Sequence, residues 1–114
     1  MKKAEKNNIE KEDQEIQEIM DLAHNGDPAA QRELGCWYYN PVDEMLKEAL
    51  KWWRRAAKGN DADAQYFLGM EYAYGEGLLG INANVKTARK WLKLAAAQKD
   101  LEAIKMLKEM DEAE

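Results

Sequence analysis

The 114-residue sequence contains one cysteine, one histidine and two prolines, and it has no long run of apolar residues. A single thiol, that of Cys36, cannot form an internal disulfide, which is typical of a reducing compartment or of a protein indifferent to redox state. The basic start at residues 1–6 is followed by no apolar run, so we expect no secretory signal, and no later stretch is long enough to span a bilayer. A cytoplasmic protein without a membrane partner is the first expectation.

The sequence motifs of common catalytic sites are also missing. There is no Walker loop, no Gly-x-Ser-x-Gly elbow and no dinucleotide fingerprint. No motif marks a nucleophile or an orienting acid that could act with His24. A favourable interaction with the helix dipole explains the position of His24 at a helix end. One histidine and one cysteine cannot make a zinc site by themselves. We therefore expect no enzyme, no metal and no cofactor.

The composition is that of an ordinary soluble domain. The hydrophobic fraction is 46%, the charged fraction is 34%, and the net charge is −5 at pH 7. A chain of this length can bury one modest core, which favours a single domain over residues 1–114. The acidic balance provides no general attraction to nucleic acid or to anionic membranes, so neither is expected as a partner.

What the sequence does contain is an internal repeat. The segments 30–38 (AQRELGCWY) and 64–72 (AQYFLGMEY) share the skeleton Ala-Gln-x-x-Leu-Gly-x-x-Tyr at a spacing of 34 residues (64 − 30). A second motif, Ala-x-x-Trp-x-x-x-Ala-Ala at 49–57, returns at 88–96, at a spacing of 39 residues (88 − 49). The two spacings differ because extra residues separate the two motifs in the second unit, as expected for a loop between conserved helices.

Apolar residues recur at helical spacing between turn-forming residues, and no convincing period-two strand pattern is present. Asp27, Asp61, Asn84 and Asp100 precede helical segments as N-caps, and Asn40-Pro41 ends one of them. The sequence therefore predicts an all-α protein with six helices, at about 9–25, 28–39, 42–58, 61–74, 84–98 and 100–112.

These helices form two hairpins, repeat 1 (28–59) and repeat 2 (61–98), between an N-terminal capping helix (9–25) and a C-terminal capping helix (100–112). Residues 1–8 are polar, and we expect them to be disordered or frayed. The two capping helices keep only part of the motifs, as terminal units of a stacked array do. Within the repeats, Gly35 and Gly69 allow close approach of a partner helix. Large rings then fill the wedge between hairpins: Tyr38, Trp52, Tyr72 and Trp91.

At these residues the sequence resembles the Sel-like repeat family, a close relative of the tetratricopeptide repeat. The resemblance lies in the two repeated motifs and the Gly-x-Gly loop at 75–77, and it covers roughly residues 26–103. The first unit departs from the pattern, because residues 40–42 replace the glycine turn. The resemblance implies a short α-solenoid of antiparallel helical hairpins, and a bacterial scaffold or adaptor that binds other proteins.

Tetratricopeptide-like solenoids line a concave groove with the first helix of each hairpin. The side of these helices opposite the core therefore gives the candidate partner-binding residues, since aromatic, Met and Arg side chains on an exposed face favour interfaces. The alternative is that Tyr66 and Met70 pack against the next hairpin. The candidates are Arg32, Cys36, Tyr39, Tyr66, Met70, Ala73, Lys105 and Glu109.

The second helices carry basic side chains that we expect on the convex side, away from the tryptophan faces. A role in tracking phosphates is conceivable, but the acidic total and the lack of interleaved exposed aromatic residues favour a solvated surface. These residues are Lys47, Lys51, Arg54, Arg55, Lys58, Lys86, Arg89, Lys90 and Lys93.

The leading hypothesis is a non-catalytic scaffold that binds a protein or peptide in the groove. A second hypothesis is an immunity-type inhibitor that neutralises a basic toxin or enzyme. An enzymatic role in β-lactam chemistry, known for cysteine-rich members of the family, is disfavoured because the paired cysteines are missing. Because two hairpins are close to the minimum for a stable array, the sequence also allows self-association. It would use the last helix, through Ile104, Met106, Leu107 and Met110.

Overall fold

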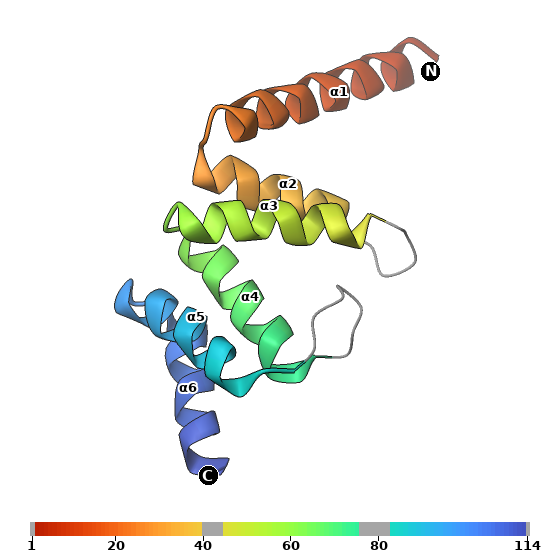
Figure 1. The fold of residues 1–114 in the computed structure, drawn as a ribbon. Helices are drawn as coiled ribbons and strands as arrows, with labels where there is room; N and C mark the ends of the chain where they lie inside the picture. Colours follow the sequence, from red (N-terminus) through yellow and green to blue (C-terminus); the bar gives the residue numbers. More distant parts are fainter. Residues whose placement is uncertain (1, 40–44, 76–82, 114) are drawn as a thin grey trace.

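A computed structural model describes residues 2–39, 45–75 and 83–113, with side chains described from residue 13 onward. These residues form six α-helices and no strand: α1 (Lys2–His24), α2 (Pro28–Tyr38), α3 (Leu46–Lys58), α4 (Ala62–Tyr74), α5 (Val85–Ala97) and α6 (Leu101–Ala113). The helices stack in chain order, so that α1 and α6 lie at opposite ends of an elongated molecule of 58 × 29 × 24 Å (Figure 1). The predicted all-α solenoid of helical hairpins is confirmed.

Short polar side chains begin four of the helices, as the sequence predicts. Each accepts a hydrogen bond from the backbone amide three residues later, which satisfies one of the free amides of the first turn. The donor–acceptor distances lie between 2.9 and 3.2 Å, and the caps are Asp27, Asp61, Asn84 and Asp100. Gly26 connects α1 to α2 at a φ of +98°, a conformation that favours glycine.

Two helix boundaries differ from the sequence prediction. The segment 2–8, expected to be disordered or frayed, belongs to α1, because its lysine, alanine and glutamate residues favour helix and no glycine or proline interrupts them. α3 begins at Leu46 rather than near Val42. Met45, which lies inside the predicted range 42–58, is the N-cap residue of α3 and is 45% exposed. The predicted stop at Asn40-Pro41 lies outside the described residues, as does most of the glycine loop.

The described side chains form three core clusters, one at each step of the stack. The leucines at their centres, Leu34, Leu68 and Leu92, are at most 1% exposed. Trp52 packs with Leu34 between α1 and α3, and Trp53 packs with Leu68 between α3 and α4. The remaining rings predicted to fill the wedges are partly buried against the same clusters, which confirms the prediction: Tyr38, Tyr72 and Trp91.

Glycine is required inside two helices because a partner side chain occupies the position of its missing Cβ. At Gly35 a Cβ would lie 2.3 Å from Trp53 Cδ1, and at Gly69 it would lie 2.6 Å from Leu92 Cδ2. Both distances are far below van der Waals contact. The predicted close approach of the two helices of each hairpin is therefore confirmed.

The glutamine of the repeated motif connects successive hairpins. The Gln31 side-chain amide donates to the Ala23 carbonyl at 3.0 Å, and that of Gln65 donates to the Ala57 carbonyl at 3.1 Å. Both glutamines are buried, at 8% and 1% exposure. Each bond joins the first helix of a hairpin to the end of the helix before it, so this glutamine helps to fix the step between hairpins.

Candidate partner-binding surface

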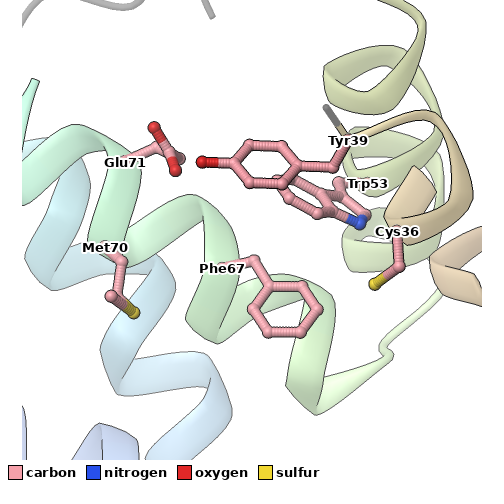
Figure 2. Close-up of a pocket in the computed structure, with 6 residues that line it drawn as sticks. All are labelled: Cys36, Tyr39, Trp53, Phe67, Met70 and Glu71. Atoms are coloured by element: carbon pink, nitrogen blue, oxygen red, sulfur yellow. The ribbon is translucent and has the colours of Figure 1, made fainter. Parts of the chain in front are cut away.

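An open, largely apolar pocket of about 330 Å³ lies between α2 and α4 (Figure 2). The end of α2 contributes Cys36, and Tyr39 follows as the C-cap residue of that helix. The other side chains lining the pocket come from α3 and α4: Trp53, Phe67, Met70 and Glu71.

Three aromatic rings form one wall of this pocket. The Trp53 ring packs against Tyr39 at a centroid distance of 5.1 Å and against Phe67 at 5.0 Å, in tilted arrangements that aromatic pairs favour. Figure 2 shows the Tyr39 hydroxyl pointing toward the Glu71 carboxylate, with Met70 on the same side of the pocket as Glu71. The pocket is thus apolar in its interior and has one carboxylate at its border.

A second hollow, of about 130 Å³, continues this surface between α4 and α6, and Met70 lines both. Burial raises the pKa of Tyr66, and the nearby carboxylates Glu102, Asp100 and Glu109 raise it further. Two glutamates and one lysine line the second hollow, which makes it polar and predominantly acidic. Its lining residues are Tyr66, Met70, Tyr74, Glu102, Lys105, Met106 and Glu109. We call the residues that line the pocket and this hollow the groove face.

Seven of the eight candidate residues lie on the groove face or beside it. Cys36, Tyr39 and Met70 line the first pocket, and Tyr66, Met70, Lys105 and Glu109 line the second hollow. Ala73 lines an adjoining hollow between α4, α5 and α6.

Tyr66, Met70 and Ala73 also pack against the core cluster centred on Leu92 and Met106. The packing of Tyr66 and Met70 against the following helices, which the sequence left open, is therefore present. Tyr66 and Met70 combine both roles, because each is only partly buried and also borders the groove face.

Arg32, the eighth candidate, makes ion pairs within the chain. Its Nε lies 3.2 Å from Asp61 and 3.6 Å from Asp63. Burial alone would lower the pKa of Arg32, but the hydrogen bond and the charge of Asp61 raise it above its ordinary value. Arg32 therefore connects α2 to the start of α4 and does not line the groove face.

Several residues of the groove face were not predicted from the sequence. Phe67 and Glu71 follow Tyr66 and Met70 directly in the chain and line the wall toward α2. Helical periodicity predicts the side of α4 on which they lie. It does not predict the orientation of the neighbouring hairpin, which decides whether they border the pocket. Trp53 belongs to the core, where it is 5% exposed, yet its ring also borders the pocket. The other residues missed are Tyr74, Glu102 and Met106.

The basic side chains of α3 border a separate shallow hollow. The expectation that they all lie away from the tryptophan faces is wrong for Arg55, whose guanidinium carbon lies 4.8 Å from the centre of the Trp52 ring. A planar guanidinium stacks favourably on an indole, which accounts for this position. Arg54 donates to the Tyr72 hydroxyl at 3.2 Å, and Arg89 pairs with Asp111. Arg54 thus connects α3 to α4, and Arg89 connects α5 to α6.

The described residues contain no cluster of three or more His, Cys, Asp or Glu side chains placed to hold a metal ion. Among the helices in the described ranges, none is both long and apolar enough to cross a membrane. His24 packs edge-on against Trp52 at 5.0 Å. Cys36 is exposed as a whole residue, but partial burial of its thiol raises the pKa of that thiol, and the adjacent Trp53 indole opposes the shift. Cys36 therefore lacks the lowered pKa of a nucleophilic cysteine.

Comparison with known proteins finds a similar protein and a similar crystal structure. The chain is similar to the chitin synthase regulator SKT5 of Saccharomyces cerevisiae, with 33% identity over 93 residues; the match covers 78% of this chain but only 13% of the yeast protein. A crystal structure of a Sel1 repeat protein from Oxalobacter formigenes matches with a TM-score of 0.70 and 34% identity, covering 81% of this chain and 26% of the other. Each relative is thus much longer than the part that matches.

The profile of the Sel1 repeat matches twice, at residues 28–61 and 62–100. Each match contains one hairpin, α2 with α3 and then α4 with α5, together with the residues that lead into the next helix. Two consecutive matches cover more than half of the sequence, and the matching crystal structure has the same repeat. The chain therefore belongs to the Sel1 repeat family.

Proposed function

We propose that this chain binds a segment of another protein along the groove face, and that it acts by binding rather than by catalysis. Sel1 repeats generally mediate interactions between proteins. The observation that supports this proposal is an open pocket with one wall of three aromatic rings beside an acidic hollow, with Met70 common to both. Aromatic and Met side chains around a concave site are typical of the centre of an interface.

The chemistry of the groove face indicates the partner. The apolar pocket suits one large apolar side chain, because its burial against Tyr39, Trp53 and Phe67 would remove apolar surface from water. Glu71, Glu102 and Glu109 border the groove face against a single lysine, Lys105. Cations flanking the apolar side chain would therefore be attracted, which strengthens binding at low salt. We infer a partner segment with a large apolar anchor and neighbouring Lys or Arg residues.

The same carboxylates favour an inhibitor of a basic protein as the second candidate function. The name of the yeast relative also describes a protein that regulates an enzyme. For this candidate, deletion of the gene should reduce viability only when a neighbouring toxin gene is intact. A viability defect that is independent of such a gene would remove the inhibitor candidate and leave the scaffold.

The binding proposal is tested with three fluorescent peptides of equal length measured by fluorescence anisotropy. The first carries a tryptophan flanked by lysines, the second the same tryptophan flanked by glutamates, and the third an alanine flanked by lysines. We expect the first peptide to bind most tightly, with an affinity that falls as salt is added, because it alone supplies both the anchor and the cations. Equal binding of all three peptides would refute the partner chemistry.

Two variants separate the pocket from the acidic hollow. Cys36→Phe adds bulk at an exposed position on the pocket wall without removing a core contact. It should lower the affinity for the lysine-flanked tryptophan peptide by about tenfold. The double variant Glu102→Gln with Glu109→Gln should lower the affinity for the lysine-flanked peptides and make that affinity less dependent on salt. Lys51→Gln, on the hollow of α3, is the matched control and should leave binding unchanged. Unchanged affinity in Cys36→Phe would place the binding site elsewhere.

A further inference from the structure

Charge is distributed unevenly between the helices of the stack. α3 contains five cations and one glutamate, and α5 contains four cations and no carboxylate, so each of these helices carries a net charge of +4. Because the whole chain carries −5, the remaining residues together carry −13 (−5 − 8). The second helices of the two hairpins are therefore a basic surface on an otherwise acidic chain, and none of their cations lines the groove face.

Some of these cations occur at equivalent positions in the two hairpins, at the same spacing of 39 residues (88 − 49) as the tryptophan motif. In each helix, three exposed cations follow one another at intervals of four and three residues. Residues at these intervals lie on one face of a helix, so each helix presents a row of positive charge. We call the six residues the cation stripes: Lys47, Lys51 and Arg54 in α3, and Lys86, Lys90 and Lys93 in α5.

The cations of α3 and α5 that do not recur have favourable interactions within the chain. Arg55 stacks on the Trp52 ring, and Arg89 pairs with Asp111. Lys58 lies in the last turn of α3, where the helix dipole favours a cation. These three positions are therefore explained by the fold itself.

The cation stripes have no such explanation. Within the described ranges none of the six forms an ion pair with a carboxylate, and Arg54 donates to the neutral hydroxyl of Tyr72. Lys47 and Lys86 lie in the first turns of their helices, where the helix dipole disfavours cations. Like charges four residues apart also destabilise a helix. An arrangement that is unfavourable in the free chain thus occurs in both hairpins, and an anionic partner would relieve it in both.

We propose that the cation stripes bind an acidic segment of a second protein, at a surface separate from the groove face. The stripe of α3 runs along the helix for about 10 Å, at 1.5 Å per residue. It borders a shallow hollow of about 410 Å³, which gives a partner access to all three cations. Alternate side chains of an extended segment lie about 7 Å apart on one side, so two or three carboxylates can face one stripe.

The surroundings of the stripes favour an acidic protein segment over nucleic acid or an anionic membrane. Single-stranded nucleic acid binds by stacking on exposed aromatic rings as well as by charge. Among the described residues no aromatic ring lines the hollow of α3, and Trp52 and Trp53 are only 3% and 5% exposed. A long polyanion or a membrane surface would also be repelled by the charge of −13 on the rest of the chain. A short acidic segment needs to contact only the stripes.

Fluorescence anisotropy with two labelled peptides of equal length tests this proposal. One peptide alternates glutamate and serine, and the other alternates glutamine and serine. We expect the glutamate peptide to bind with an affinity that falls as salt is added, and the glutamine peptide not to bind, because only the first supplies carboxylates to the stripes.

The double variant Lys47→Gln with Lys51→Gln should lower the affinity for the glutamate peptide by about fivefold. Lys99→Gln with Lys108→Gln is the matched control, because it removes the same two charges at exposed positions outside the stripes, and it should leave the affinity unchanged. Thermal denaturation of the stripe variant should show unchanged or increased stability, since the change removes a repulsion between like charges. A loss of binding is then not a loss of fold.

A glutamate peptide that does not bind, or an equal loss of affinity in the stripe variant and in the control, would overturn the proposal. So would tighter binding of a single-stranded RNA, or of vesicles of phosphatidylserine and phosphatidylcholine, if the stripe variant abolishes it. The result is independent of the groove face. The stripe variant should keep its affinity for the lysine-flanked tryptophan peptide, so failure at one surface is distinguished from failure at the other by the same protein.

Discussion

Asp61 has two structural roles, whereas the equivalent residue of the preceding repeat has one. The Asp61 carboxylate accepts a hydrogen bond from the Ala64 amide at 2.9 Å as the N-cap of α4, and it also pairs with Arg32 at 3.2 Å. Asp27 caps α2 in the same way, at 3.2 Å from the Ala30 amide. Replacing each aspartate by alanine therefore removes the same cap, but only Asp61→Ala also removes the nearer carboxylate partner of Arg32.

The expected difference follows from these contacts. Loss of an N-cap costs about 1 kcal/mol of stability. The side chains of Arg32 and Asp61 are 25% and 12% exposed, so their pair is partly screened by water and contributes about 1 kcal/mol more. Asp63 is 58% exposed and lies 3.6 Å from the Arg32 Nε, and it retains part of the attraction when Asp61 is removed. We expect Asp61→Ala to cost about 2 kcal/mol and Asp27→Ala about 1 kcal/mol.

Urea denaturation followed by far-ultraviolet circular dichroism measures both losses. Arg32→Gln in the wild type and in Asp61→Ala completes a double-mutant cycle, which isolates the energy of the pair from that of the cap. We expect a coupling of about 0.5 to 1 kcal/mol between positions 32 and 61, and none between 32 and 27. Equal losses at Asp27 and Asp61, together with additive effects of Arg32→Gln, would show that the ion pair contributes nothing to the stack.

Three further changes test the packing of the repeat and the chemistry of its cysteine. Gly69→Ala should destabilise the fold by about 1 kcal/mol in thermal denaturation, because overlap of the new Cβ with Leu92 outweighs the gain in helix propensity; a stabilised variant would contradict the close approach. Gln65→Leu should lower stability by about 1 kcal/mol through loss of the hydrogen bond to the Ala57 carbonyl; unchanged stability would show that this bond does not stabilise the contact between hairpins. Because the pKa of Cys36 is raised, its alkylation rate should reach half-maximum at a higher pH than that of a free cysteine, and a half-maximum at lower pH would refute the burial argument.

The fold was predictable because its determinants are local and occur twice. A cap such as Asp61 acts on an amide three residues away, and the spacing of Ala64, Leu68 and Tyr72 along one helix defines the face that packs. Gly35 and Gly69 have an unfavourable propensity in helices, so their presence inside two matching motifs already indicated a close contact. All of these features depend on positions within one hairpin.

The groove face was only partly predictable because it depends on how successive hairpins are oriented. Helical spacing places Tyr66 and Met70 on one side of α4, but the angle between α2 and α4 decides that Phe67 and Glu71 border the same pocket. Long side chains were the other source of error. The Arg32 side chain of α2 reaches Asp61 at the start of α4, a contact between two helices that a helical wheel does not display. The contact of Arg55 with Trp52, three residues earlier on the same helix, has a spacing that a helical wheel does display, and it was missed.

The structure also explains why function should be sought at positions that the repeat does not duplicate. Cys36, Met70 and Glu109 occupy the same position in α2, α4 and α6, and their chemistry changes from a thiol to a thioether to a carboxylate along the stack. The groove face changes in the same direction, from an apolar pocket between α2 and α4 to an acidic hollow between α4 and α6. A segment bound there with its apolar anchor at α2 and its cations at α6 would have a single orientation. A surface built from identical repeats could not impose this orientation, because it would present the same chemistry at every step.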